Sequence, residues 1–184
     1  MLRTSCLLLF FLIGTAGIPA EEGCSCPWAG VYPTVLTPWH CHADGVDTAA
    51  LEAQLRYQLQ APIHGVLLLG TLGEGMYASE AERCQVIATA NEVIQGKIPI
   101  IVGIHTADVT RAIAQAKQAQ ALGAQAVLVK YTGCARFCEI LSFYHTLADQ
   151  SPLPVFYYHI PGSVLRPLSP QEVIQVVRHP NIVG

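Results

Sequence analysis

Residues 112–130 read AIAQAKQAQALGAQAVLVK, which places a helix, a glycine and a strand in direct succession. Small and apolar side chains recur at helical spacing over residues 112–122, and this pattern predicts an amphipathic helix. Gly123 can adopt the left-handed conformation that ends such a helix. The run over 126–130 is apolar at nearly every position, as in a parallel strand buried on both faces. The stretch therefore predicts one crossover unit of a parallel α/β sheet.

The same unit recurs along the chain. Short apolar runs begin at residues 31, 65, 98, 126, 155 and 182, roughly 30 residues apart, as in successive βαβ units. Capping residues mark helix starts between them: Asp47, Ser79 with Glu82, and Ser169-Pro170 with Glu172. No Gly-x-Gly-x-x-Gly follows the first strand, so a barrel is favoured over a dinucleotide-binding fold. Since a complete barrel takes about 250 residues, we expect a partial TIM (β/α)8 barrel of about five β/α units plus the start of the sixth strand.

The N-terminus differs in composition from the rest of the chain. Arg3 precedes an apolar run over residues 7–13, and small residues follow it. This is the pattern of a secretory signal peptide, and the run is shorter than the ~20 residues that span a bilayer. We expect a signal peptide over 1–20, a linker over 21–28 and the N-terminal part of a barrel over 29–184. This division predicts entry into the secretory pathway.

Charge and cysteine content limit the class of ligand. The formal net charge is -3 with no basic run, so we expect a small-molecule ligand and no nucleic acid. Two readings of the six cysteines after residue 20 stay open, because an even number fits disulfides whereas buried free thiols behave as small hydrophobes. No metal site is predicted, since Cys24-Ser25-Cys26 is too tight for zinc and His40-Cys41-His42 has no second ligand pair.

Two strand ends carry candidate functional residues. The loop GTLGEG at 70–75 can turn successive amide N–H groups toward one anion, although a plain tight turn has the same composition. The segment YYHIP at 157–161 places phenols and an imidazole at another strand end. A phenol there can carry a proton to and from a substrate, whereas Tyr157 and His159 are expected to serve packing and the loop.

Together these segments resemble the pyruvate-dependent class I aldolases that comprise dihydrodipicolinate synthase and N-acetylneuraminate lyase. The resemblance runs from about Ala29 to Gly184. It is carried by GVYPTVLTP at 30–38, GTLGE at 70–74, SEAER at 79–83, LGAQA at 122–126 and YHIP at 158–161.

The resemblance implies roles for individual residues. The loop of Gly70, Thr71, Leu72 and Gly73 would bind the pyruvate carboxylate, and Thr71 and Tyr158 would be catalytic as the proton relay. Leu72 departs from the usual hydroxyl residue, which removes one donor worth about 1.5 to 3 kcal/mol. Ser163 stands where the synthase keeps a substrate-binding arginine. The pattern is therefore closer to the N-acetylneuraminate lyase branch, with a synthase-like or 4-hydroxy-2-oxoglutarate aldolase-like enzyme as the alternative.

The Schiff-base lysine of these enzymes lies just beyond a stretch like residues 179–184, where this sequence stops. The lysines present are Lys97, Lys117 and Lys130, and of these Lys130 is expected at the right end of a strand. It is a hypothesis that Lys130 replaces the lost amine, because a lysine beside Tyr131 in an open sheet is expected to reach solvent. Tyr131 is the nearest candidate for the tyrosine that completes the relay.

The expected function is Schiff-base cleavage or condensation of 2-oxo acids with pyruvate, without cofactor or metal. We expect the 184-residue chain itself to be inactive, since it lacks the amine. A homo-oligomer is expected if the full barrel exists, and the resemblance gives cytoplasm or an organelle as the alternative to the secretory pathway. The alternatives are a non-catalytic carboxylate-binding or assembly module that pairs its open sheet edge with a partner, and an unstable fragment.

Overall fold

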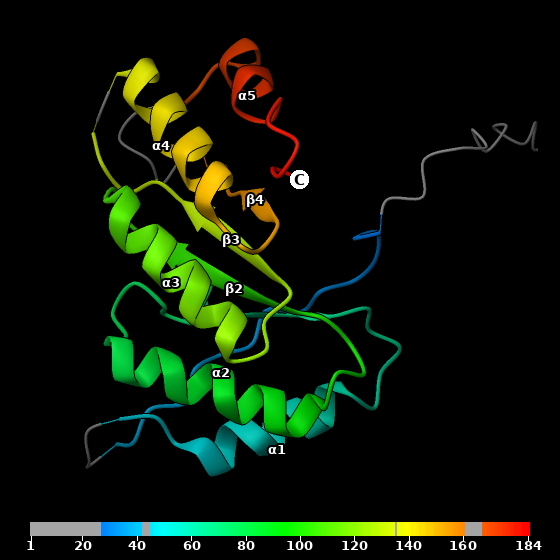
Figure 1. The fold of residues 1–184 in the computed structure, drawn as a ribbon. Coiled ribbons are helices and arrows are strands. Elements are labelled where there is room, and N and C mark those ends of the chain that lie inside the picture. Colours follow the sequence, from blue (N-terminus) through cyan, green and yellow to red (C-terminus); the bar gives the residue numbers. More distant parts are fainter. Residues whose placement is uncertain (1–26, 42–44, 135, 161–166) are drawn as a thin grey trace, which may run out of the picture.

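The computed structural model describes residues 27–41, 45–134, 136–160 and 167–184. The expected signal peptide and most of the expected linker lie outside these residues, and the domain start at residue 29 stays a prediction. Helices and strands alternate along the chain (Figure 1). They are α1 (Thr48–Gln58), β1 (Val66–Leu68), α2 (Glu80–Ile94), β2 (Ile100–His105), α3 (Val109–Ala121), β3 (Ala126–Lys130), α4 (Phe137–Gln150), β4 (Val155–Tyr157) and α5 (Pro170–Val176).

The strands form one parallel sheet in the order β1-β2-β3-β4. Parallel bridges extend it on both sides, from Thr34 to Leu67 beside β1 and from Ile182 to Val155 beside β4. The apolar runs that begin at residues 31 and 182 are thus single bridges, and the four runs between them contain the strands. The α/β architecture with sequential parallel strands is confirmed.

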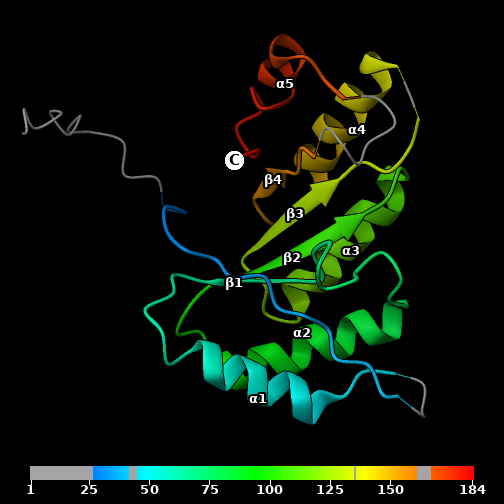
Figure 2. The same cartoon turned by 180° about the vertical axis from the view of Figure 1, so that it is seen from behind.

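The helices lie on one side of the sheet, and the view from behind shows the strands in front of them (Figures 1 and 2). The helix-facing side chains of the strands join the helices in one buried core cluster. Val66, Val102, Val127 and Val155 belong to this cluster and are almost fully buried. Since side chains alternate along a strand, the residues between them face the other side, which we call the inner face.

The predicted helix-capping residues agree with the structure. Asp47 caps α1 by accepting a hydrogen bond from the amide of Ala50. Ser79 and Ser169 each form a capping box with the glutamate three residues later. Gly123 follows α3 with a φ of 93°, the left-handed conformation expected of it.

Register places three pairs on the inner face of β2 and β3. Ile101 is opposite Ala126, Gly103 is opposite Leu128, and His105 is opposite Lys130. The prediction that Lys130 reaches solvent is wrong, because only 9% of its surface is exposed. The reason is its parity in the strand: an inner-face side chain lies within the concave side of the sheet, whereas its neighbour Tyr131 is turned toward the helices.

The described residues include four of the six cysteines that follow residue 20, and they can be searched for metal-binding clusters. Cys41, Cys84, Cys134 and Cys138 are free thiols, whereas Cys24 and Cys26 lie outside the described part. Within the same ranges no cluster of three metal-ligating side chains occurs. None of the helices described is long and apolar enough to cross a membrane.

Candidate active site

The loop after β1 has the free amides that an anion site needs. It is closed by hydrogen bonds from the Gly75 amide to the Gly70 carbonyl and from the Glu74 amide to the Thr71 carbonyl, at 3.2 Å each. The amides of Leu72 and Gly73 donate to no residue in the described part of the chain. Two adjacent free N–H groups in a turn are typical of carboxylate binding, so the amides predicted to bind an anion are available for one.

Leu69, at the start of this loop, packs its carbonyl group closely against Gly75 and Gly103. Leu69 has a φ of 53°, a left-handed conformation that is rare for a leucine. A Cβ added to Gly75 or Gly103 would lie 2.0 Å or 2.2 Å from the Leu69 carbonyl oxygen, so both positions require glycine. The His105 ring donates from Nε2 to the same oxygen over 3.0 Å, since a carbonyl can only accept.

Burial lowers the pKa of His105 and outweighs the hydrogen bond to the Leu69 carbonyl, which raises this pKa, while the charges of Arg83 and Lys130 make smaller contributions that lower it. His105 is therefore a neutral donor that holds the Leu69 carbonyl.

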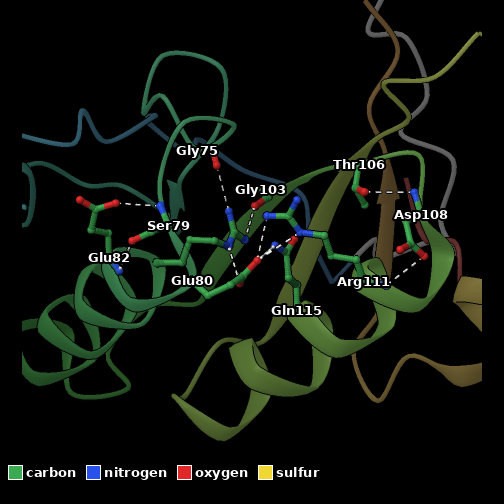
Figure 3. Close-up of polar contacts among 10 residues, drawn as sticks. Gly75, Ser79, Glu80, Glu82, Gly103, Thr106, Asp108, Arg111 and Gln115 are labelled. Atoms are coloured by element: carbon green, nitrogen blue, oxygen red, sulfur yellow. Dashed lines mark hydrogen bonds and ion pairs between the residues drawn. The ribbon is translucent and has the colours of Figure 1, made fainter.

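Polar contacts to the Gly75 and Gly103 carbonyls join the loop to the sheet (Figure 3). Arg83 of α2 donates to the Gly75 carbonyl over 3.2 Å and to the Gly103 carbonyl of β2 over 2.8 Å. Its charge is offset by Glu80, whose carboxylate is 3.9 Å from the guanidinium and is also bound by Arg111 and Gln115 of α3 at 2.9 Å and 2.7 Å. The end of the loop is thereby fixed to two secondary-structure elements.

The segment before α1 holds the loop from the other side. The buried Thr37 hydroxyl donates to the Gly73 carbonyl over 2.6 Å, and the Trp39 indole donates to the Glu74 carboxylate over 2.7 Å. Thr37 holds the Gly73 carbonyl in place, and the Gly73 amide donates to no residue in the described part of the chain. Sequence reasoning missed both contacts, because residues 37 and 73 are brought together only by the pairing of Thr34 with β1.

Thr71 and Tyr158, the two predicted relay residues, meet in the structure. The Thr71 hydroxyl donates to the Tyr158 phenol oxygen over 3.4 Å, although the residues are 87 positions apart. Thr71 follows β1 and Tyr158 follows β4, so the curvature of the sheet brings the carboxyl ends of its outer strands together. Both hydroxyl groups lie at the edge of the sheet where parallel barrels hold their substrates.

Neighbouring aromatic residues serve the fold. The Tyr157 phenol bonds the His159 ring over 2.9 Å, and Tyr157 packs edge to face on the fully buried Tyr144. Burial, with a contribution from Glu172, raises the pKa of Tyr157 to about 12. The packing role expected for Tyr157 fits these contacts.

Tyr131 lies apart from the hydroxyl pair. Its ring packs edge to face on Phe143 of α4, and its amide donates to the Tyr144 phenol oxygen, which itself donates to the Val129 carbonyl. Its hydroxyl makes no hydrogen bond to Thr71 or Tyr158. A relay role for Tyr131 stays a prediction.

Comparison with known proteins places this arrangement in a family. The model of the "Dihydrodipicolinate synthetase family" matches residues 27–184. The 4-hydroxy-tetrahydrodipicolinate synthase of Stenotrophomonas maltophilia (strain R551-3) is 35% identical over 159 residues, which are 85% of this chain and 53% of that protein. That of Methanosphaerula palustris is 32% identical over 158 residues, 84% of this chain and 54% of that protein. The chain thus spans about half the length of the relatives it matches.

Solved structures show the same fold. The dihydrodipicolinate synthase of Agrobacterium tumefaciens superimposes with a TM-score of 0.78 at 26% identity, covering 85% of this chain and 53% of that one. CdNal from Clostridium difficile, solved in complex with mannosamine, has a TM-score of 0.77 at 19% identity, covering 83% of this chain and 53% of its own. The fold is that of part of these TIM barrels, which confirms the partial barrel expected from the sequence.

Proposed function

Because this chain belongs to the dihydrodipicolinate synthetase family, we propose that it binds a 2-oxo acid, with pyruvate as the first candidate, at the carboxyl ends of its strands. The family is one of lyases of the aldolase type, and the chain contributes the carboxylate-binding loop and the proton relay of such a site. The observation that carries the proposal is the contact of Thr71 with Tyr158 beside the free amides of Leu72 and Gly73.

The positions of the loop amides, Thr71 and Tyr158 suggest a separate role for each. The Leu72 and Gly73 amides donate to the carboxylate, which fixes the position of the adjacent 2-oxo carbon. The Thr71 and Tyr158 hydroxyl groups are 3.4 Å apart, and with Thr71 as the donor of this hydrogen bond the phenol hydrogen of Tyr158 can donate to a substrate oxygen. Tyr158 is then the general acid and base, and Thr71 orients it.

Carbon–carbon chemistry of the Schiff-base type also needs an amine. Lys97 and Lys117 are exposed, on the segment before β2 and on α3, and Lys130 alone of the three lysines lies on the inner face. In our proposal Lys130 is not the Schiff-base amine, so residues 1–184 bind the 2-oxo acid reversibly and do not by themselves cleave or form a carbon–carbon bond. A carboxylate-binding module without catalysis would also bind the 2-oxo acid reversibly.

The branch of the family is also a proposal. The two relatives compared above are named synthases, yet Ser163 replaces the arginine that the resemblance implies for that activity. We therefore favour a substrate other than that of the synthase, of the N-acetylneuraminate lyase type or, as the alternative, of the 4-hydroxy-2-oxoglutarate aldolase type. Ser163 itself lies outside the described residues.

Substitution of Leu72 tests carboxylate binding directly. Its side chain is 67% exposed, so Leu72→Thr changes no core contact and adds a hydroxyl donor beside the two amides. We expect Leu72→Thr to bind pyruvate about tenfold more tightly than the wild type in isothermal titration calorimetry.

Leu72→Val is the matched control, because valine has the shape of threonine without its hydroxyl group. Equal affinities of the threonine and valine variants would contradict a carboxylate bound at this loop.

A further inference from the structure

Lys130 occupies a position that the proposed carboxylate site does not use. It is the last residue of β3, with His105 as its register partner on β2. On the other side, Val129 is opposite Tyr157 of β4, so the next position along places Tyr158 beside Lys130. The three residues form one row across the inner face, at the edge of the sheet that carries the 70–75 loop.

The charge of Lys130 has no counter-charge in the described part of the chain. No residue there forms a hydrogen bond or ion pair with its ammonium group, although the residue is only 9% exposed. His105 is a neutral neighbour held by the Leu69 carbonyl, and Tyr158 is bonded to Thr71. Residues 161–166, which follow β4, include no Asp or Glu in the sequence. A buried cation normally has an anionic partner, so the missing anion is expected to come from a ligand.

This position is distinct from the amides of Leu72 and Gly73. The loop follows β1, whereas Lys130 ends β3, with β2 between them, so the two groups approach a ligand from different strands. A small molecule with two anionic groups can offer one of them to the loop amides and the other to Lys130.

We propose that Lys130 binds a second anionic group of the ligand, so that the site selects 2-oxo acids that carry an anionic group at the end remote from the 2-oxo carboxylate. This inference rests on the proposed function, in which the 70–75 loop binds the first carboxylate. Lys130 acts as an ammonium ion that forms a charge-assisted hydrogen bond, and no covalent step is involved.

The test compares three ligands and two variants by calorimetry. Pyruvate and 2-oxopentanoate have one carboxylate, and 2-oxoglutarate has the same carbon chain as 2-oxopentanoate with a second carboxylate. We expect the wild type to bind 2-oxoglutarate more tightly than 2-oxopentanoate. Lys130→Met should weaken 2-oxoglutarate binding about tenfold or more while the affinities for pyruvate and 2-oxopentanoate stay unchanged.

Further variants provide controls. Lys130→Arg keeps the charge and should keep the preference for 2-oxoglutarate, whereas Lys130→Gln, a second neutral variant, should lose it. Lys117→Met removes an exposed lysine of α3 and should change nothing. Near-ultraviolet circular dichroism shows whether each variant keeps its packing.

The outcomes separate the two proposals. If the wild type binds none of the three ligands, carboxylate binding fails and this inference fails with it. If the wild type binds pyruvate but Lys130→Met leaves the 2-oxoglutarate affinity unchanged, or weakens all three ligands equally, only the role of Lys130 is overturned.

Discussion

Leu69 shows how single residues shape the candidate site. Its left-handed backbone turns the chain out of β1 into the loop, and such a conformation costs a non-glycine residue on the order of 1 kcal/mol. It is held because the carbonyl of Leu69 accepts from His105 and fits against Gly75 and Gly103. The loop amides thus keep their positions before any ligand arrives.

The His105 contact predicts a pH dependence of stability. Burial lowers the folded-state pKa of His105 from its ordinary 6.5, so the unfolded chain binds this proton at higher pH than the native protein. The stabilisation is complete above about pH 6.5 and is lost as the pH falls toward the folded-state pKa. We expect the free energy of unfolding of the wild type to fall more steeply between about pH 7 and pH 5 than that of His105→Gln.

Urea denaturation at a series of pH values measures this difference. Glutamine can still donate to the Leu69 carbonyl, so the variant retains the contact without the titration. Parallel pH profiles for the two proteins would show that His105 carries no linked proton.

At the scale of elements, α2 links the loop to the sheet. Its capping box was predictable from Ser79 and Glu82 because capping depends on residues three positions apart. The contact of Arg83 with the Gly75 and Gly103 carbonyls was not, because it joins three elements that only packing brings together.

Arg83 and Arg111 offer a paired test of this link. Arg83 is 2% exposed, whereas the Arg111 side chain, bound to the same Glu80, is 54% exposed. Arg83→Met leaves two buried carbonyls without donors and should lower the free energy of unfolding by about 3 kcal/mol. Arg111→Met should cost at most about 1 kcal/mol, because the pair it breaks is in solvent. Chemical denaturation measures both, and similar losses would contradict an anchoring role for Arg83.

At the scale of the whole molecule, the candidate site depends on the packing of all the strands together. The core cluster extends from Val35 to Ile182, so the residues of the site are held by one packed body in which the carboxyl ends of β1 and β4 meet. Whether this body performs chemistry depends on an amine beside the bound 2-oxo carbon.

Trapping with borohydride tests this at the scale of the whole chain. A lysine that forms an imine with pyruvate is reduced to a stable secondary amine, and the protein gains the mass of pyruvic acid less one oxygen atom. For the 184-residue chain we expect no such gain in intact-mass spectrometry. A cooperative thermal transition of the same sample serves as the control for folding, and an adduct mapped to Lys130 would contradict both the absence of catalysis and the purely ionic role of that residue.

The sequence by itself determined the elements of this protein and the family to which it belongs. These features depend on residues that are close together in the sequence, so they can be predicted from it. They are the helix caps, the strand runs and the GTLGE and YHIP segments. Only the tertiary structure decided that Thr71 meets Tyr158, that Thr37 and Arg83 fix the loop, and that Lys130 is buried rather than exposed. These outcomes depend on the curvature of the sheet and on the inward or outward parity of each strand residue, which are set when distant strands pair.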